Sequence, residues 1–191
     1  MDFFTADLHF GHKNILSFCN RPWNTVDEMN EGLILLFNGV VTPDDTTYFL
    51  GDISFASKTK TLEYVSRLHG RKVLVIGNHD TNKSVEWWGQ LFDEVHDPRH
   101  GKVIPYNADF VMTHLPWRES LYEYDHREYL VCHACPRRDD VRLLHGHVHE
   151  TWVQRANQIN VGCDVWGYQP VSVEVLRQMP LLQDYPQRVI M

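Results

Sequence analysis

Short apolar runs, each followed at once by a polar residue, recur along the chain. Runs of this length without helical spacing predict β-strands, and they cover residues 3–6, 46–50, 72–76, 110–113, 141–144 and 159–161. The run at 72–76 is continuously apolar after its first residue, which predicts a strand buried on both faces.

Two helices are predicted between these strands. Thr25 and Glu28 have the spacing of a capping box, and apolar residues at helical spacing continue from there as far as Gly39. A second helix is predicted over 61–68, with Gly70 as its C-terminal stop. Strands that alternate with helices predict an α/β fold.

The composition is that of a globular protein. With 191 residues, of which 43% are hydrophobic, the chain is expected to form one domain over residues 1–191. No apolar run approaches the roughly eighteen residues that a membrane span needs. The first residues lack the basic and apolar regions of a signal peptide. We therefore expect a cytoplasmic protein with no membrane partner.

The net charge of −7 argues against one class of partner. A long nucleic acid duplex is held through its phosphates by a basic stripe, and Lys and Arg form no such cluster here. A small anion remains compatible, because a bound metal supplies positive charge locally. The four cysteines include one close pair, Cys132 and Cys135, without the further ligands of a zinc finger, so we expect free thiols.

Five of the predicted strands end in Asp, Asn or His. Ligands bind outside the carboxyl ends of strands in open α/β sheets, so one site is expected to collect Asp7, His9, Asp52, Asn78, His114, His147 and His149. Carboxylate, imidazole and amide ligands without thiolate suit two catalytic divalent ions, with Mn favoured and Fe or Zn as alternatives. Two ions about 3.5–4 Å apart activate a water and stabilise both oxygens of an in-line displacement. Two carboxylates leave such a centre positive, so a small phosphate ester is the expected substrate.

The same segments carry a family resemblance. In chain order, they resemble the five motifs of calcineurin-like metallophosphoesterases: Asp7-Leu8-His9, Gly51-Asp52, Gly77-Asn78-His79-Asp80, Thr113-His114 and Gly146-His147-Val148-His149. The residues outside these motifs, at 10–12, 19–22 and 160–167, resemble those of a small bacterial and phage subgroup of phosphoesterases.

The resemblance implies a four-layer αββα sandwich with two mixed β-sheets and hydrolysis by a metal-bridging hydroxide. It implies that one ion is held by Asp7, His9, Asp52 and His149. Asp52 would bridge to a second ion, held also by Asn78, His114 and His147. His79 would be the general acid or the electrostatic partner of the leaving group.

The chain departs from the protein Ser/Thr phosphatase branch of this family. That branch has a second carboxylate three residues after the bridging aspartate, where this chain has Phe55, and an arginine near the position of Asn82. Protein phosphatase activity is therefore not expected. What orients His79 is left open, with the adjacent Asp80 as one candidate.

The favoured function is hydrolysis of phosphodiesters of the nucleotide or cyclic-nucleotide type. A site without arginines to bind the phosphate is less suited to a doubly charged monoester than to a singly charged diester. The alternatives are a small-molecule phosphomonoesterase and a non-catalytic protein-binding scaffold with the same fold. His12 and Arg21 are candidates to bind the substrate phosphate. Trp87, Trp88 and the segment 166–168 either cover the sheets or form a homo-oligomer interface.

Overall fold

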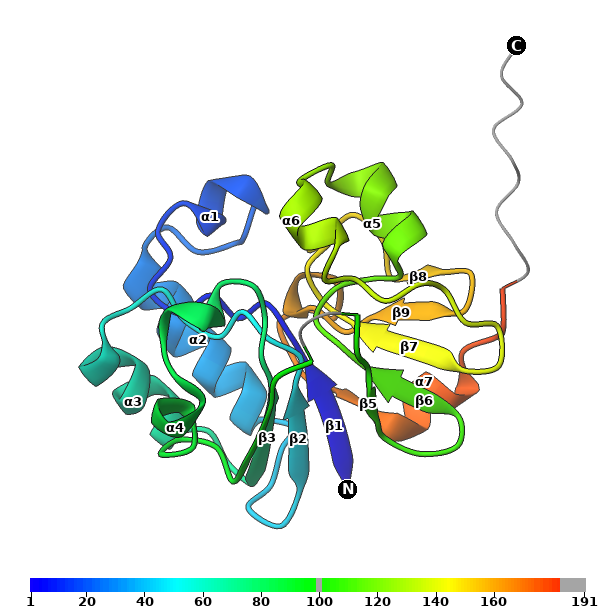
Figure 1. Cartoon of the computed structure of the whole chain (residues 1–191). Helices are drawn as coiled ribbons and strands as arrows, with labels where there is room; N and C mark the ends of the chain where they lie inside the picture. The colour runs from blue at the N-terminus through cyan, green and yellow to red at the C-terminus, as the bar shows by residue number, and fades with distance from the viewer. Residues whose placement is uncertain (99–100, 183–191) are drawn as a thin grey trace.

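Ten strands, seven α-helices and two short 3-10 helices (Asp80–Asn82 and Cys163–Val165) lie in the described part of the chain, residues 1–98 and 101–182 of a computed structural model (Figure 1). The strands are β1 (Asp2–Thr5), β2 (Thr46–Phe49), β3 (Arg71–Val75), β4 (Glu94–His96), β5 (Ile104–Pro105), β6 (Phe110–Met112), β7 (Arg142–His145), β8 (Gln154–Arg155), β9 (Gln158–Asn160) and β10 (Val171–Ser172). The helices are α1 (Ile15–Phe18), α2 (Val26–Asn38), α3 (Lys58–Ser66), α4 (Val85–Trp88), α5 (Arg118–Tyr124), α6 (Glu128–Val131) and α7 (Val173–Gln178). The last nine residues of the predicted domain, 183–191, lie outside the described residues.

The strands form two mixed sheets, as predicted. The first has the order β10-β1-β2-β3-β4, in which β1 to β4 are parallel and β10 is antiparallel to β1. The second has the order β5-β6-β7-β9-β8, with a parallel centre and antiparallel strands at both edges. The predicted α/β class and the pair of mixed sheets are confirmed.

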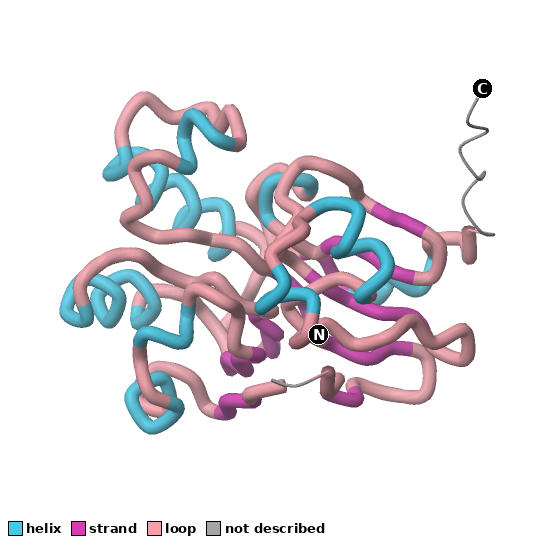
Figure 2. The backbone as a smooth tube through the Cα atoms, turned by 45° about the horizontal axis from the view of Figure 1, so that its top comes forward, coloured by secondary structure: helices cyan, strands magenta, loops and turns pink. Residues whose placement is uncertain are grey.

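The two sheets lie beside each other with helices outside them, as Figures 1 and 2 show. Phe4 and Leu50 of the first sheet pack against Met112 and Leu144 of the second and form the core between the sheets. Helices α1 to α4 lie on the side of the first sheet, and α5 and α6 on the side of the second (Figure 1). The buried Trp117 packs against the outer face of the second sheet.

Helix α2 begins where the capping box predicts. The Thr25 hydroxyl accepts the backbone N–H of Glu28, the Glu28 carboxylate accepts that of Thr25, and the helix ends before Gly39. Helix α3 begins three residues earlier than predicted, because Ser57 caps it by accepting the backbone N–H of Lys60.

The tryptophans and Tyr168 pack against the sheets, while a homo-oligomer interface stays a prediction. Trp88 is fully buried, and Trp87 and Tyr168 pack against the same core, between the first sheet and its helices. Trp166 packs against the core between the sheets. These aromatic residues therefore cover the sheets within one chain. The four cysteines are free thiols, as expected, and no helix in 1–98 or 101–182 is long and apolar enough to cross a membrane.

Candidate metal centre

All seven predicted ligands lie at one edge of the sandwich, where the parallel strands of both sheets end. On the first-sheet side, the Nε2 atom of His9 lies 3.9 Å from Asp7 Oδ1 and 3.7 Å from Asp52 Oδ2. The ring of His149, from the second sheet, lies with its centre 5.1 Å from that of His9. Ligand atoms of Asp7, His9 and His149 all lie within 4.8 Å of one another, close enough to hold one ion.

A second group of ligand atoms adjoins the first. Asp52 Oδ2 lies 3.4 Å from His114 Nε2. The amide oxygen of Asn78 lies 2.9 Å from His114 Nε2 and 3.0 Å from His147 Nδ1. Ligand atoms of Asp7, Asp52 and His114 also lie within 4.8 Å of one another, close enough to hold one ion. The two groups share Asp7, and Asp52 lies between His9 and His114.

The backbone at these positions is strained. Eight non-glycine residues in 1–98 and 101–182 have positive φ, and five of them are predicted ligands: Asp7, His9, Asp52, His147 and His149. A side chain in this left-handed region costs about 1–3 kcal/mol and persists only where the surroundings enforce it. This conformation turns two residues that are two apart, such as Asp7 and His9, toward the same point at the end of a strand. The strain is therefore concentrated at the candidate site.

Two motif glycines make room for the carboxylates. A Cβ atom on Gly77 would lie 2.4 Å from Asp52 Oδ1, and one on Gly146 would lie 2.5 Å from Asp7 Oδ2. Either contact is far below van der Waals distance. The glycine before Asn78 and the glycine before His147 are thus required by the close approach of the two aspartates.

Backbone and carboxylate acceptors orient two of the histidines. His114 Nδ1 lies 2.7 Å from the carbonyl oxygen of Leu50, so a proton on Nδ1 leaves Nε2 free to face the site. His149 Nδ1 lies 2.8 Å from Asp164 Oδ2. A carboxylate behind a histidine fixes its tautomer and orientation in the manner of many metal ligands. Asp164 was not recognised in the sequence, although it lies in the segment 160–167 that resembles the subgroup.

Arg21 does not lie where it could contact a substrate phosphate. Its side chain is fully buried and forms two hydrogen bonds to Asp164, 2.8 and 3.0 Å long. It also donates to the carbonyl oxygens of Asp7 and Leu8, at 2.7 and 2.9 Å. Arg21 therefore supports the loop that carries Asp7 and His9 and holds Asp164 against His149, and the prediction that it grips phosphate is corrected accordingly.

The two central aspartates differ in their electrostatics. Burial raises the pKa of Asp7 to about 6. Burial acts on Asp52 in the same direction, but the nearby His114 and His9 outweigh it and hold the pKa of Asp52 well below its ordinary value. Burial lowers the pKa of His114, but Asp52 outweighs it and raises that pKa to about 9. A bound cation would displace the proton that Asp52 favours on His114, since metal ligands must be deprotonated.

Unpaired buried nitrogens indicate that these residues fit a metal. Among the described residues, neither ring nitrogen of His9 has a hydrogen-bond partner, and the same holds for Nε2 of His147. Burial lowers the pKa of both histidines, that of His147 to about 3, so both rings are neutral. A buried polar atom without a partner costs about 1–3 kcal/mol. A cation at the site would accept the single lone pair that each neutral ring offers and remove that part of the cost.

His79 lies at the edge of the centre, and no carboxylate of the described residues forms an ion pair with its ring. Its backbone N–H donates to Asp52 Oδ1 over 2.9 Å, and its ring centre lies 4.8 Å from that of Phe55. Asp80, the candidate to orient it, instead accepts the backbone N–H groups of Asp52, Ile53 and Gly77. Asp80 therefore shapes the loop that carries Asp52, while Phe55 is the side chain that packs on His79.

His12 lies close to the first group of ligands. Its ring centre is 5.7 Å from that of His9 and 4.2 Å from that of the half-exposed Phe55. This position is compatible with the predicted contact to a substrate phosphate, which stays a prediction.

The segment of α5 and α6 brings two further charged residues to the centre. Asp125 Oδ2 lies 3.6 Å from Nε2 of His147, and Arg127 forms an ion pair with Asp125. Burial lowers the pKa of His79; of its charged neighbours, Asp52 raises that pKa and Arg127 lowers it. Neither Asp125 nor Arg127 was singled out in the sequence, because they belong to none of the five motifs.

Comparison with known proteins gives relatives over almost the whole chain. The chain is 32% identical over 181 residues to the uncharacterized protein MJ1445 of Methanocaldococcus jannaschii, covering 90% of this chain and 86% of that protein. It is 32% identical over 186 residues to the Gene 66 protein of Mycobacterium phage L5, covering 86% of each. The protein of unknown function AQ665 from Aquifex aeolicus has a similar structure, with a TM-score of 0.64 and 26% identity over 93% of this chain and 97% of that one. No family model matches the chain.

The chain belongs to the same family as the archaeal protein MJ1445 and the Gene 66 protein of Mycobacterium phage L5. The segments whose motifs resemble those of calcineurin-like metallophosphoesterases are the ones that meet at this site. The buried Asp and His groups are compatible with metal binding.

Proposed function

We propose that the protein is a two-metal phosphodiesterase acting on small diesters of the nucleotide or cyclic-nucleotide type. The observation that supports this most is the position of Asp52, whose Oδ2 lies 3.7 Å from His9 Nε2 and 3.4 Å from His114 Nε2. His9 and His114 belong to the two adjoining groups of ligand atoms. One carboxylate shared between them favours a pair of ions over a single one.

The donor set favours Mn, with Fe or Zn as alternatives, because it combines carboxylate, imidazole and amide oxygen. Asp7, His9, Asp52 and His149 would hold one ion, and Asp52, Asn78, His114 and His147 the other. Two divalent ions supply positive charge for an anionic ester and lower the pKa of a bound water. Asp164, Leu50 and Arg21 keep the histidine and aspartate ligands in place for this role.

The arginines favour a diester over a monoester. Arg21 is enclosed behind Asp164, and Arg127 is already paired with Asp125. Neither is available as a dedicated clamp for a second negative charge on phosphate. With neither arginine free to bind a second negative charge, a singly charged phosphodiester fits this site better than a doubly charged phosphomonoester.

His79 is proposed to serve the leaving group. It follows Asn78 directly, its side chain is exposed, and its backbone is fixed to Asp52. The imidazole can thus approach a departing oxygen without coordinating an ion. The apolar face of Phe55 limits how far the ring turns.

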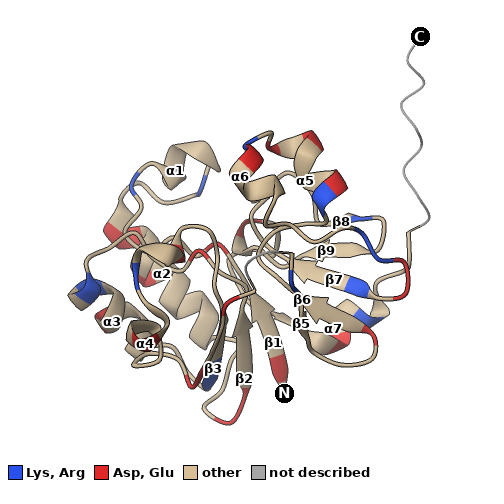
Figure 3. Ribbon diagram, viewed as in Figure 1, with Lys and Arg blue, Asp and Glu red and all other residues tan. Residues whose placement is uncertain are grey.

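A small substrate also agrees with the distribution of charge. Basic residues are scattered over several elements in the view of Figure 3 and form no continuous stripe there. A duplex bound through many phosphates requires such a stripe.

The test is a comparison of esters with the Mn-loaded protein. Bis(p-nitrophenyl) phosphate, p-nitrophenyl phosphate and a cyclic nucleotide would be assayed under identical conditions. We expect both diesters to be hydrolysed faster than the monoester. A faster monoester reaction would replace the proposal with phosphomonoesterase activity, and no hydrolysis of any ester would favour the scaffold.

A further inference from the structure

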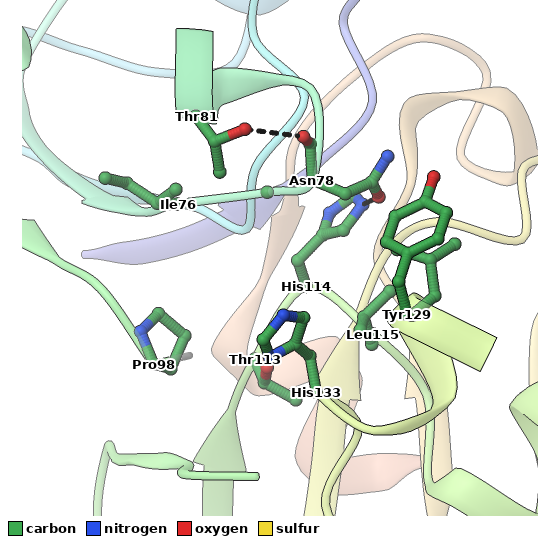
Figure 4. A pocket seen from close by; sticks show the side chains of 11 residues that line it. Ile76, Asn78, Thr81, Pro98, Thr113, His114, Leu115, Tyr129 and His133 are labelled. Atoms are coloured by element: carbon green, nitrogen blue, oxygen red, sulfur yellow. Dashed lines mark hydrogen bonds between the residues drawn. The ribbon is translucent and has the colours of Figure 1, made fainter. Parts of the chain in front are cut away.

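A cavity of about 260 Å³ opens directly beside the candidate metal centre (Figure 4). Asn78 and His114, which belong to the second group of predicted ligands, form one of its walls. The cavity is therefore continuous with the place where the phosphate would bind. Any organic group attached to that phosphate can enter the cavity without leaving the site.

The remaining walls are largely apolar. Ile76 comes from the end of β3, Leu115 from the loop after β6, and Leu130 from α6. Leu115 and Leu130 are held by the small core that joins α5 to α6, so these walls are fixed side chains. Cavities that enclose a whole drug-sized ligand measure about 300–1,000 Å³. This one is smaller and matches a single ring system.

Tyr129 on α6 also lines the cavity, and 56% of its surface is exposed. An exposed aromatic ring beside an apolar cavity is a surface on which another ring can stack. The Tyr129 hydroxyl accepts a hydrogen bond of 3.1 Å from Arg127 Nη1, and the guanidinium carbon lies 5.7 Å from the ring centre. These contacts restrict the orientation of the ring before any ligand arrives.

We propose that this cavity, with Tyr129 on its wall, binds an aromatic or heteroaromatic ring on the ester group of the substrate. The phosphate lies on the side of Asn78 and His114, and the ring enters between Leu115, Leu130 and Tyr129. This inference rests on the proposed phosphodiesterase function and makes it more specific. It predicts that aryl and nucleoside esters are preferred to alkyl esters.

The experiment measures the binding of two product analogues, phenyl phosphate and methyl phosphate, to the Mn-loaded protein by calorimetry. Base and aromatic stacking is worth ~1–3 kcal/mol, so the wild type is expected to bind phenyl phosphate about tenfold more tightly than methyl phosphate. Tyr129→Ala should remove most of this preference and leave methyl phosphate binding unchanged. Tyr129→Phe should keep the preference, because the ring is retained.

Tyr122→Ala is the matched control. Tyr122 is a tyrosine of the neighbouring helix α5 with 61% of its surface exposed, and it does not line the cavity. This variant should behave as the wild type, and both alanine variants should keep the metal content of the wild type. Equal wild-type affinity for the two phosphates, or equal effects of the two alanine variants, would overturn the ring-binding role alone. If the Mn-loaded wild type bound neither phosphate, the proposed function would be overturned with it.

Discussion

At the residue scale, the side chains behind the ligands matter as much as the ligands. Asp164 connects the buried Arg21 to His149, and both side chains of the ion pair are almost completely buried. Breaking a buried pair by removing one charge costs about 3–5 kcal/mol, and mutating the group that orients a metal ligand typically costs about 10–100-fold in metal affinity. Asp164→Asn should therefore lower both the free energy of unfolding and the affinity for Mn, measured by urea denaturation and by metal titration.

The exposed pair of Arg67 and Glu31 provides the control. It has the same two-pronged geometry but remains largely exposed to water. Exposed pairs contribute little to stability, so Glu31→Gln should leave both quantities near those of the wild type. If the two variants behaved alike, the supporting role assigned to Asp164 would be wrong.

The role of His79 gives a second prediction at this scale. General acid catalysis contributes about 10²–10⁴-fold where the leaving group is basic. His79→Ala should therefore reduce kcat strongly for an alkyl or nucleoside ester and much less for a p-nitrophenyl ester, with metal content unchanged. An equal loss of kcat on both substrates would assign His79 to charge stabilisation of the phosphoryl group. A loss of metal would make it a ligand or a support for one.

The sequence predicted the ligands better than their supports. Asp7, Asp52, Asn78 and His114 lie within three residues of a strand end. Parallel strands end at one edge of a sheet, so the convergence of these residues follows from local pattern. Asp164 acts on residues that are far away in the chain, and no local pattern encodes those contacts. Arg21 was assigned to substrate for the same reason, since its burial depends on how three distant segments pack.

At the scale of elements, the start of α2 could be predicted because Thr25 and Glu28 form a capping box that is visible in the sequence. The Thr25 hydroxyl accepts the N–H of Glu28 over 3.1 Å, which satisfies an amide that the helix leaves unpaired. Thr25→Ala should lower the free energy of unfolding by about 1 kcal/mol, and Thr25→Ser should restore most of it. Urea denaturation with an unchanged slope measures the effect. An alanine variant as stable as the wild type would contradict the assigned cap.

The elements that were missed are short and depend on tertiary contacts. Strand β10 has two residues and exists because it pairs with Phe3 and Phe4. Helix α5 has only seven residues and no side-chain cap. It therefore shows neither a clear helical spacing of apolar residues nor a capping residue that would mark its first turn. Because α5, α6 and the loop between them carry Asp125, Arg127 and Tyr129, the missed elements include those that approach the candidate metal centre.

At the scale of the whole molecule, metal binding should stabilise the fold. Five strained ligands and the unpaired nitrogens of His9 belong to the folded state, and a cation that binds only this state shifts the folding equilibrium toward it. Free Mn at a hundred times its dissociation constant contributes about 2.7 kcal/mol, which raises Tm by roughly 5–10 °C for a chain of this size. Differential scanning calorimetry with and without Mn measures the shift. An unchanged Tm at saturating Mn would contradict a site formed by the folded chain.

The central claim is that two ions act together on a phosphodiester, and the Mn stoichiometry of hydrolysis tests it most directly. Protein stripped of metal would be titrated with Mn while the hydrolysis of bis(p-nitrophenyl) phosphate is followed, with Asp52→Asn as the comparison. We predict no hydrolysis without metal and a rate that saturates at two equivalents of Mn per chain. In Asp52→Asn, hydrolysis should be lost and bound Mn reduced at both positions. Saturation at one equivalent, or undiminished hydrolysis by the stripped protein, would contradict the claim.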